Sequence, residues 1–175
     1  GSDPDAALYW LCRMLDGGED RLFIARRMVR MAVEDIGIAD PQALVQALAA
    51  KDTYDFLGSL EGELALAQTV IYLATAPKSN SATAYFKAMK ILEDTGQVSV
   101  PRHLMDGNRD AAAMGHGKDY VYPHEQEGHF TPQQYLPKRL SGTYFYSPSH
   151  EGHAPQARCD RADRPPGRHR QGGCE

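Results

Sequence analysis

Apolar residues recur at helical spacing through the first half of the chain, and Gly or Pro closes each run. In the first run the spacing i, i+3, i+4, i+7 puts one set of side chains on a single helix face. Ser2 or Asp3 caps this helix, Pro4 opens it and Gly17 ends it. Its predicted core face consists of Ala7, Leu8, Leu11, Cys12 and Leu15.

Four further helices are predicted by the same pattern, over about 21–36, 41–49, 59–76 and 82–93, with a short turn near 54–57. Asp20 caps the first of these, Ser59 caps the third, and Gly96 closes the last. The third is apolar on more than one side, which is typical of a central helix. The inward face of helix 21–36 is expected to hold Phe23, Ile24, Met28, Met31 and Ala32. That of helix 41–49 is expected to hold Leu44, Val45, Leu48 and Ala49, and that of helix 82–93 Tyr85, Phe86, Met89 and Leu92.

The pattern changes after residue 98. A short helix is predicted near 104–114, whereas 120–148 holds many aromatic residues without a sustained period. We expect this stretch to be an irregular arm that lays Tyr and Phe side chains along the helical core or across to a partner chain. Residues 151–175 are rich in Arg, Pro and Gly, which is typical of disorder. The sequence thus predicts an all-α domain over 2–150, with core helices in 3–95, an arm in 98–150 and a disordered tail.

Composition narrows the classes of protein to consider. The chain has 175 residues, of which 42% are apolar and 24% charged, as in one soluble globular domain. A net charge of −4 argues against a domain whose main role is to bind nucleic acid. No apolar run approaches the ~20 residues needed to span a membrane, and the first residues do not resemble a secretory signal. Three scattered cysteines form no disulfide framework, so we expect a reducing cytoplasm and a buried Cys12.

Arg26, Arg27 and Arg30 form a basic cluster on the second helix, followed by Glu34 and Asp35. Such a cluster can contact a phosphate backbone. The two carboxylates dilute its charge, which favours a solvated face or an ion-pair surface toward a neighbouring subunit.

Lys78, followed by Ser79 and Asn80, precedes the fifth helix, where backbone N–H groups attract phosphate. We favour a plain turn lysine beside polar capping residues. His116, His124 and His129 match no zinc-binding spacing, and we expect surface or aromatic packing roles for them.

No catalytic or nucleotide-binding motif is found. The stretch 115–118 (GHGK) only partly matches a phosphate loop, because Ala112 replaces its first Gly and Asp119 replaces the Ser or Thr that follows Lys. The chain also lacks a Gly-x-Ser-x-Gly elbow. The residues therefore indicate a helical packing module, with no cofactor-binding, metal-binding or catalytic residues assigned.

Four consecutive motifs point to a family. The chain resembles the C-terminal region of the replication-associated recombination protein A ATPases, the RarA/MgsA type. The resemblance rests on four stretches in this order: SDPDAALYWLCRML, DGGEDRLFIARRMVRMAVEDIGIADPQAL, EGELALAQTVIYLATAPKSN and YVYPHEQEGHFTPQQYLP. The resemblance covers about 2–148. It is weaker in 104–114, which holds less lysine than the family, and it ends where the composition changes after Gly152.

The resemblance implies a clamp-loader-collar-like helical domain that assembles an AAA+ ATPase into a homotetramer. The whole proteins of this family bind ATP and Mg²⁺ in an N-terminal module and act at stalled replication forks with DNA and single-stranded-DNA-binding protein. This chain carries no Walker A or B stretch, so the resemblance implies a non-catalytic segment of a cytoplasmic, nucleoid-associated protein. The matched positions expected at interfaces are Arg26, Arg27, Glu34, Asp35, Lys78, Ser79 and Asn80.

Three functions are compared. The leading hypothesis is a homo-oligomerisation module, in which charge reversal at Arg27 breaks assembly. The second is a domain that binds forked or single-stranded DNA through Arg26, Arg27, Arg30 and Lys78, with salt-dependent affinity. The third is a metal-dependent enzyme using His124 and His129, which would purify with stoichiometric metal.

Overall fold

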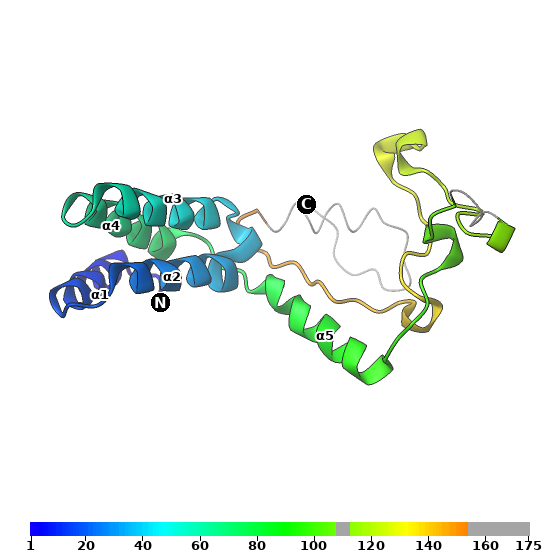
Figure 1. Cartoon of the computed structure of the whole chain (residues 1–175), viewed down its shortest axis with the longest axis horizontal. Helices are drawn as coiled ribbons and strands as arrows, with labels where there is room; N and C mark the ends of the chain where they lie inside the picture. The colour runs from blue at the N-terminus through cyan, green and yellow to red at the C-terminus, as the bar shows by residue number, and fades with distance from the viewer. Residues whose placement is uncertain (108–112, 154–175) are drawn as a thin grey trace. The chain divides into compact units, whose positions relative to one another are not determined.

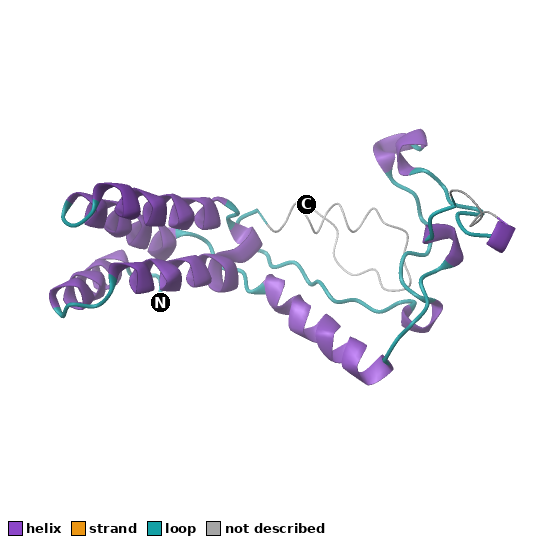
Figure 2. Cartoon of the chain, in the orientation of Figure 1, coloured by secondary structure: helices purple, strands orange, loops and turns teal. Residues whose placement is uncertain are grey.

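The computed structural model describes residues 1–107 and 113–153, which form helices and loops without a strand (Figures 1 and 2). The all-α prediction is therefore confirmed for the described residues. The described residues contain five α-helices: α1 (Pro4–Asp16), α2 (Arg21–Met31), α3 (Gln42–Leu57), α4 (Glu61–Thr75) and α5 (Ala84–Thr95). Short helical turns extend α2 and join the elements, among them a π-turn (Ala32–Ile36) and 3₁₀ turns at Gly37–Ala39, Ser81–Thr83, Arg102–Leu104, Pro123–Glu125, Glu127–His129 and Lys138–Leu140.

The chain divides into two compact units. The helical unit comprises residues 1–85 together with the returning segment from Tyr146, and the irregular unit comprises residues 86–145. The predicted functional boundary (2–150) stays a prediction. Most of the predicted disordered tail lies outside the described residues.

Capping side chains set the starts of the first two helices, as expected. An Asp3 side-chain oxygen accepts a hydrogen bond from the Ala6 N–H at 3.0 Å, and an Asp20 oxygen accepts one from Phe23 N–H at 2.6 Å. Two other expectations are wrong. Residues 54–57 belong to α3, not to a turn, and α4 starts after Leu60 without a side-chain cap from Ser59.

The core of the helical unit is centred on α4, which packs against α1, α2 and α3. This confirms the central position predicted from its apolar surface. The large buried side chains are Leu11, Ile24, Met28, Ile36, Leu66 and Leu73. Between them, small residues of α2 and α3 let the helix backbones approach closely.

The buried face of α3 differs from the prediction. Ala43, Ala47 and Ala50 are buried at i, i+4 and i+7, while Leu44, Val45 and Leu48 are exposed. The physical reason is the short separation between α3 and α4. An added Cβ at Gly62 of α4 would lie only 2.8 Å from the Cα of Tyr54 in α3, so the two backbones approach closely at this point, and the buried α3 positions before Tyr54 are alanines.

Other apolar residues expected in the core are also exposed. Phe23 and Met31 lie at the edges of the buried face of α2 and are exposed, and Cys12 is an exposed free thiol instead of a buried one. On α5 no residue is buried, and the expected inward set is exposed, namely Tyr85, Phe86, Met89 and Leu92. Helical periodicity identified amphipathic faces but not which of them has a neighbour within the chain.

The irregular unit is held by loop contacts. A ring nitrogen of His103 lies 2.7 Å from Gln134 O, and Lys87 Nζ donates to Tyr144 O at 2.6 Å. Residues 120–148 contain only isolated 3₁₀ turns, which confirms the absence of a long helix there. Whether their aromatic side chains lie along a helical core or on a partner stays a prediction.

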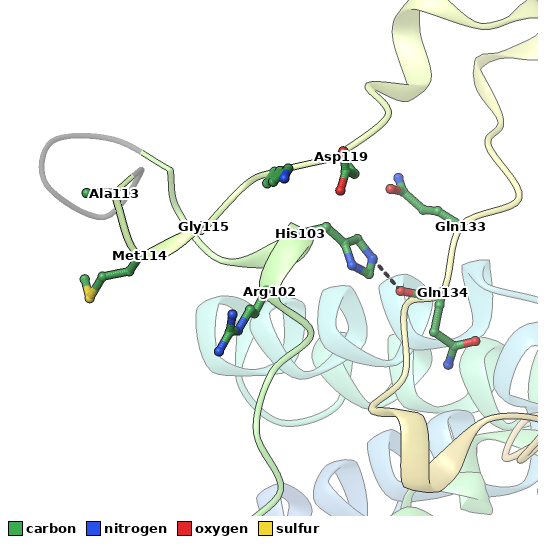
Figure 3. Close-up of a pocket in the computed structure, with 9 residues that line it drawn as sticks. Arg102, His103, Ala113, Met114, Gly115, Asp119, Gln133 and Gln134 are labelled. Atoms are coloured by element: carbon green, nitrogen blue, oxygen red, sulfur yellow. Dashed lines mark hydrogen bonds between the residues drawn. The ribbon is translucent and has the colours of Figure 1, made fainter.

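An open hollow of about 560 Å³ lies in this unit between Arg102–His103, the 113–119 turn and Gln133–Gln134 (Figure 3). In the close-up the Arg102 side chain points away from Asp119 and Gln133. The lining combines the cations Arg102 and Lys118, the carboxylate of Asp119 and the amides of Gln133 and Gln134.

Candidate interaction surface of the helical unit

The basic cluster lies on the exposed side of α2, opposite the buried Ile24, Ala25 and Met28. Arg30 Nε donates to Glu34 Oε2 at 2.7 Å, one helical turn along. This bond, together with the charge of the guanidinium, lowers the pKa of Glu34, and the same pair raises the pKa of Arg30. Arg30 is therefore paired within its own chain.

Arg26 and Arg27 differ from Arg30. Both are exposed, and neither makes an ion pair within the part of the chain that the structure describes. Arg27 contributes weakly to the lowered pKa of Glu34, as a charge at longer range. Leu22 and Phe23 are exposed beside them, one turn earlier on α2. We call these four residues the basic face; it combines arginine with apolar side chains, a composition typical of interface cores.

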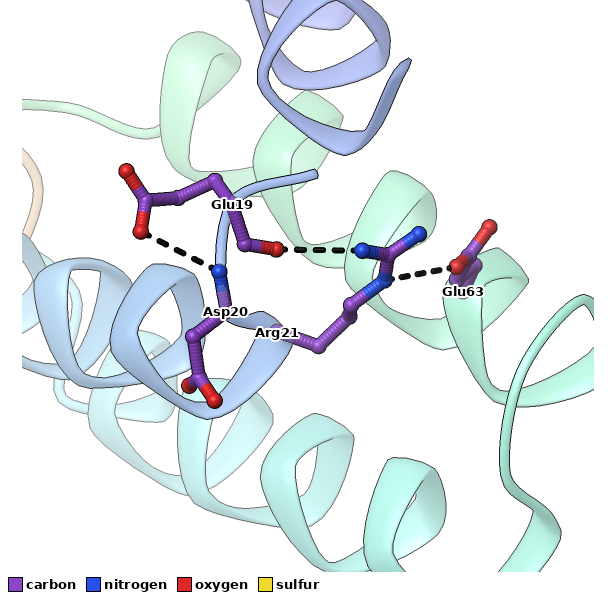
Figure 4. A network of polar contacts seen from close by, with 4 residues as sticks. All are labelled: Glu19, Asp20, Arg21 and Glu63. Atoms are coloured by element: carbon purple, nitrogen blue, oxygen red, sulfur yellow. Dashed lines mark hydrogen bonds and ion pairs between the residues drawn. The ribbon is translucent and has the colours of Figure 1, made fainter. Parts of the chain in front are cut away.

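The start of α2 is anchored, which fixes the orientation of the basic face. Arg21 Nε donates to Glu63 Oε1 of α4 at 3.0 Å, and its NH1 group donates to Glu19 O at 3.1 Å (Figure 4). The two charged side chains are only 27% and 19% exposed, so this ion pair is less screened than a surface pair. The Asp20 cap lies directly beside it.

The structure brings two predicted groups together through the backbone. Ser79 N–H donates to the carbonyl of Asp35 at 2.9 Å, which joins the end of the α2 extension to the segment after α4. Gly37 permits this approach, because a Cβ there would lie 2.5 Å from Ser79 O and its φ is +52°. Ser79 is buried, with its hydroxyl 2.9 Å from that of Ser81. The Asp35 side chain is exposed.

Lys78 closes the C-terminal end of α4. Its Nζ donates to the carbonyl of Ala76 at 2.7 Å and to that of Leu73 at 3.0 Å. A cation at this end also interacts favourably with the helix dipole. A DNA contact by Lys78 would have to break these bonds, so the geometry favours the turn-lysine interpretation. Asn80 acts through its carbonyl, which accepts from Thr83 N and Oγ1.

Sequence reasoning missed an exposed apolar cluster at the α3–α4 connection. Phe56 is 88% exposed, Leu57 46%, Leu60 79% and Leu64 72%; we call these four the apolar tip. Leu60 has φ +67° and ψ −64°, a strained conformation for a bulky residue. The available signal was the stretch 56–60 (FLGSL), where a turn is flanked by large apolar residues instead of polar ones.

The histidines of the irregular unit pack with aromatic rings. The ring centres of His124 and His129 are 5.1 Å apart, and those of Tyr122 and His124 are 5.3 Å apart. This agrees with the predicted aromatic packing of these two residues. The described residues contain no group of three or more potential ligands that could hold a metal ion.

Comparison with known proteins identifies the family. A family model described as the MgsA AAA+ ATPase C terminal matches residues 1–162. The chain belongs to this family. The resemblance noted in the sequence motifs is thereby confirmed, and the segment corresponds to the non-catalytic C-terminal part of such ATPases.

The chain is also similar to individual proteins over most of its length. The replication-associated recombination protein A of Coxiella burnetii is 49% identical over 155 residues, which are 87% of this chain and 35% of that protein. The protein of the same name from Escherichia coli K12 is 40% identical with the same coverage. ATPase WRNIP1 of Dictyostelium discoideum is 41% identical over 83% of this chain and 17% of its own length. The chain thus spans about a third of the bacterial relatives.

Among the described helices, none has both the length and the apolar character needed to cross a membrane.

Proposed function

We propose that this chain is the homotetramerisation module of an AAA+ ATPase that acts in replication-fork repair and recombination. The observation that carries the proposal is the apolar surface of α1–α4. Among the described residues, these helices expose more large apolar side chains than they bury, including Tyr9, Trp10, Phe23 and Phe56. Large exposed apolar side chains in this number are typical of helices that pack against a partner chain. Family membership supports the same role.

The test is the mass of the purified chain in solution, measured by light scattering over a wide concentration range at fixed salt. A homotetramer has a mass four times the 19.3 kDa of one chain. A mass of 19.3 kDa at every concentration would refute the proposal. Proteins whose assembly is coupled to folding also show a melting temperature that rises with concentration, which gives an independent readout.

The activities of the whole protein belong to this proposal as well. ATP and Mg²⁺ would be bound by an AAA+ module outside this segment. DNA and single-stranded-DNA-binding protein would be partners of the assembled ATPase, in the cytoplasm and at the nucleoid. The segment itself would contribute assembly, without catalysis.

A second candidate function is DNA binding by the basic face, favoured by the exposure of Arg26 and Arg27 without an ion pair in the described residues. Binding of forked and single-stranded DNA should then weaken steeply with salt. The double variant R26E/R27E should reduce the slope of log K against log salt by about 2. The matched control is K138E/R139E, which reverses two exposed charges in the irregular unit. Equal binding by both variants would exclude this candidate.

A further inference from the structure

Two surfaces of the helical unit are complementary in charge and both contain exposed apolar side chains. One is the apolar tip, and the other is the basic face of α2 (Leu22, Phe23, Arg26 and Arg27). We propose that the apolar tip of one copy docks against the basic face of a second copy. This inference rests on the proposed self-assembly and assigns it to particular residues.

The tip carries an acidic rim. Asp52 and Asp55 of α3 and Glu61 of α4 are exposed around the apolar tip, and Lys51 is the one cation between residues 51 and 61. Lys51 lies 2.7 Å from Asp55 and 3.2 Å from Asp52, so it neutralises only part of the rim. The rim therefore keeps a net negative charge.

The basic face supplies the matching charges. Arg30 is occupied by Glu34 in the same chain, which leaves the Arg26 and Arg27 guanidinium groups available to carboxylates of another molecule. Arginine suits this role because its planar guanidinium group forms bidentate hydrogen bonds with carboxylates. It also stacks on aromatic rings such as that of Phe56. A second copy is the occupant because one molecule presents both halves of the contact.

The apolar tip has a structure that favours insertion into a partner. Phe56 projects almost fully into solvent at the end of α3, where burial against another chain would remove one of the largest exposed apolar surfaces of the unit. The strained backbone at Leu60 holds a leucine in this exposed position, where glycine would be the unstrained choice. Strain of this kind is concentrated at sites of function.

The test uses complementary charge reversals in the full 175-residue chain. D52K/D55K makes the rim basic, so that it is repelled by the basic face of another copy. R26E/R27E makes the face acidic, so that it is repelled by the rim. Each variant alone should weaken self-association by at least about tenfold, measured by sedimentation equilibrium. In an equimolar mixture, each surface meets an opposite charge, and association should return to about the wild-type level.

Two further variants separate fold from interface. F56E changes a side chain that makes almost no intramolecular contact, so the variant should fold normally by circular dichroism and associate at least about tenfold more weakly. K138E/R139E is the control for a double charge reversal outside both surfaces, with unchanged association expected, because both side chains are exposed in the irregular unit. Higher salt should weaken wild-type assembly, because exposed charge pairs are screened.

The outcomes distinguish this inference from the proposed function. If the wild-type chain is monomeric at all concentrations, the proposed self-assembly fails, and this contact fails with it. If the wild type assembles but D52K/D55K, R26E/R27E and F56E assemble equally well, self-assembly stands and the contact is overturned. A mixture that fails to restore association also overturns it, because the two surfaces would then not face each other.

Discussion

Gly62 offers a sharp test of the α3–α4 contact, because helix propensity and steric packing predict changes of opposite sign in the stability of Gly62→Ala. In a helix interior this substitution stabilises by about 1 kcal/mol through helix propensity, and this is an upper bound for Gly62, the second residue of α4. Here the new Cβ would lie 2.8 Å from Tyr54 Cα and 3.0 Å from Tyr54 Cδ2. Carbon atoms prefer separations of about 3.5–4.0 Å. A backbone atom cannot rotate away, so the helices must separate.

The magnitude follows from these terms. Overpacking of a core costs about 1–3 kcal/mol, and the upper part of this range applies because the clash includes the backbone. After the propensity gain, Gly62→Ala should destabilise by about 1–2 kcal/mol. For a unit of this size the melting temperature should fall by roughly 5–15 °C.

The assay is thermal unfolding followed by circular dichroism, at fixed protein concentration because assembly shifts the melting temperature. Gln68→Ala is the matched control, since Gln68 is exposed on the same helix and its replacement should change the melting temperature little. An unchanged or higher melting temperature for Gly62→Ala would show that α3 and α4 are not in close backbone contact.

Three other substitutions test local interactions. Tyr72→Phe removes the 2.6 Å hydrogen bond from Tyr72 Oη to Asp40 Oδ2 and should lower the free energy of unfolding by about 1–2 kcal/mol in urea. That bond raises the pKa of Tyr72, so the difference from wild type should be complete below about pH 10 and shrink as the pH rises through the raised pKa; a constant difference would contradict this origin. Lys78→Met should lower the free energy of unfolding by about 1 kcal/mol more than the exposed control Lys90→Met, because it removes the ammonium group that donates to the α4 carbonyls. Equal free energies of unfolding for the two variants would argue against that cap. Leu60→Gly should raise the free energy of unfolding of the monomer by about 1 kcal/mol by relieving strain, and a loss would show that this backbone is unstrained.

The starts of α1 and α2 and the ends of α1 and α5 could be predicted from the sequence because local chemistry sets them, whereas the end of α3 could not. Asp3 and Asp20 side chains accept from the first-turn N–H groups, and Gly17 and Gly96 follow helix ends. The missing side-chain cap before α4 could not be predicted, because the strained Leu60 breaks the usual rule that polar residues precede helices.

The buried faces were less predictable than the helices. Periodicity placed Leu44, Val45 and Leu48 inward, yet α3 buries Ala43, Ala47 and Ala50, and its backbone approaches α4 closely at Gly62. The same limit applies to α5, whose amphipathic pattern does not say whether its neighbour is in the same chain. Of the candidate site residues, the structure joined Asp35 and Ser79 through backbone atoms, which leave no side-chain signature.

The returning segment should allow the length of residues 86–145 to vary between relatives. The chain leaves the helical unit after Tyr85 and rejoins it from Tyr146, where His153 N–H bonds to Ala39 O at 2.7 Å and Gly152 fits against Ala39 and Pro77. The irregular unit is thus an insertion between two segments of the helical unit. Doubling the length of a flexible loop within it costs only about 0.6 kcal/mol of closure entropy. Insertions and deletions between lineages should therefore accumulate in residues 86–145, while the Gly152 contact keeps the scaffold unchanged.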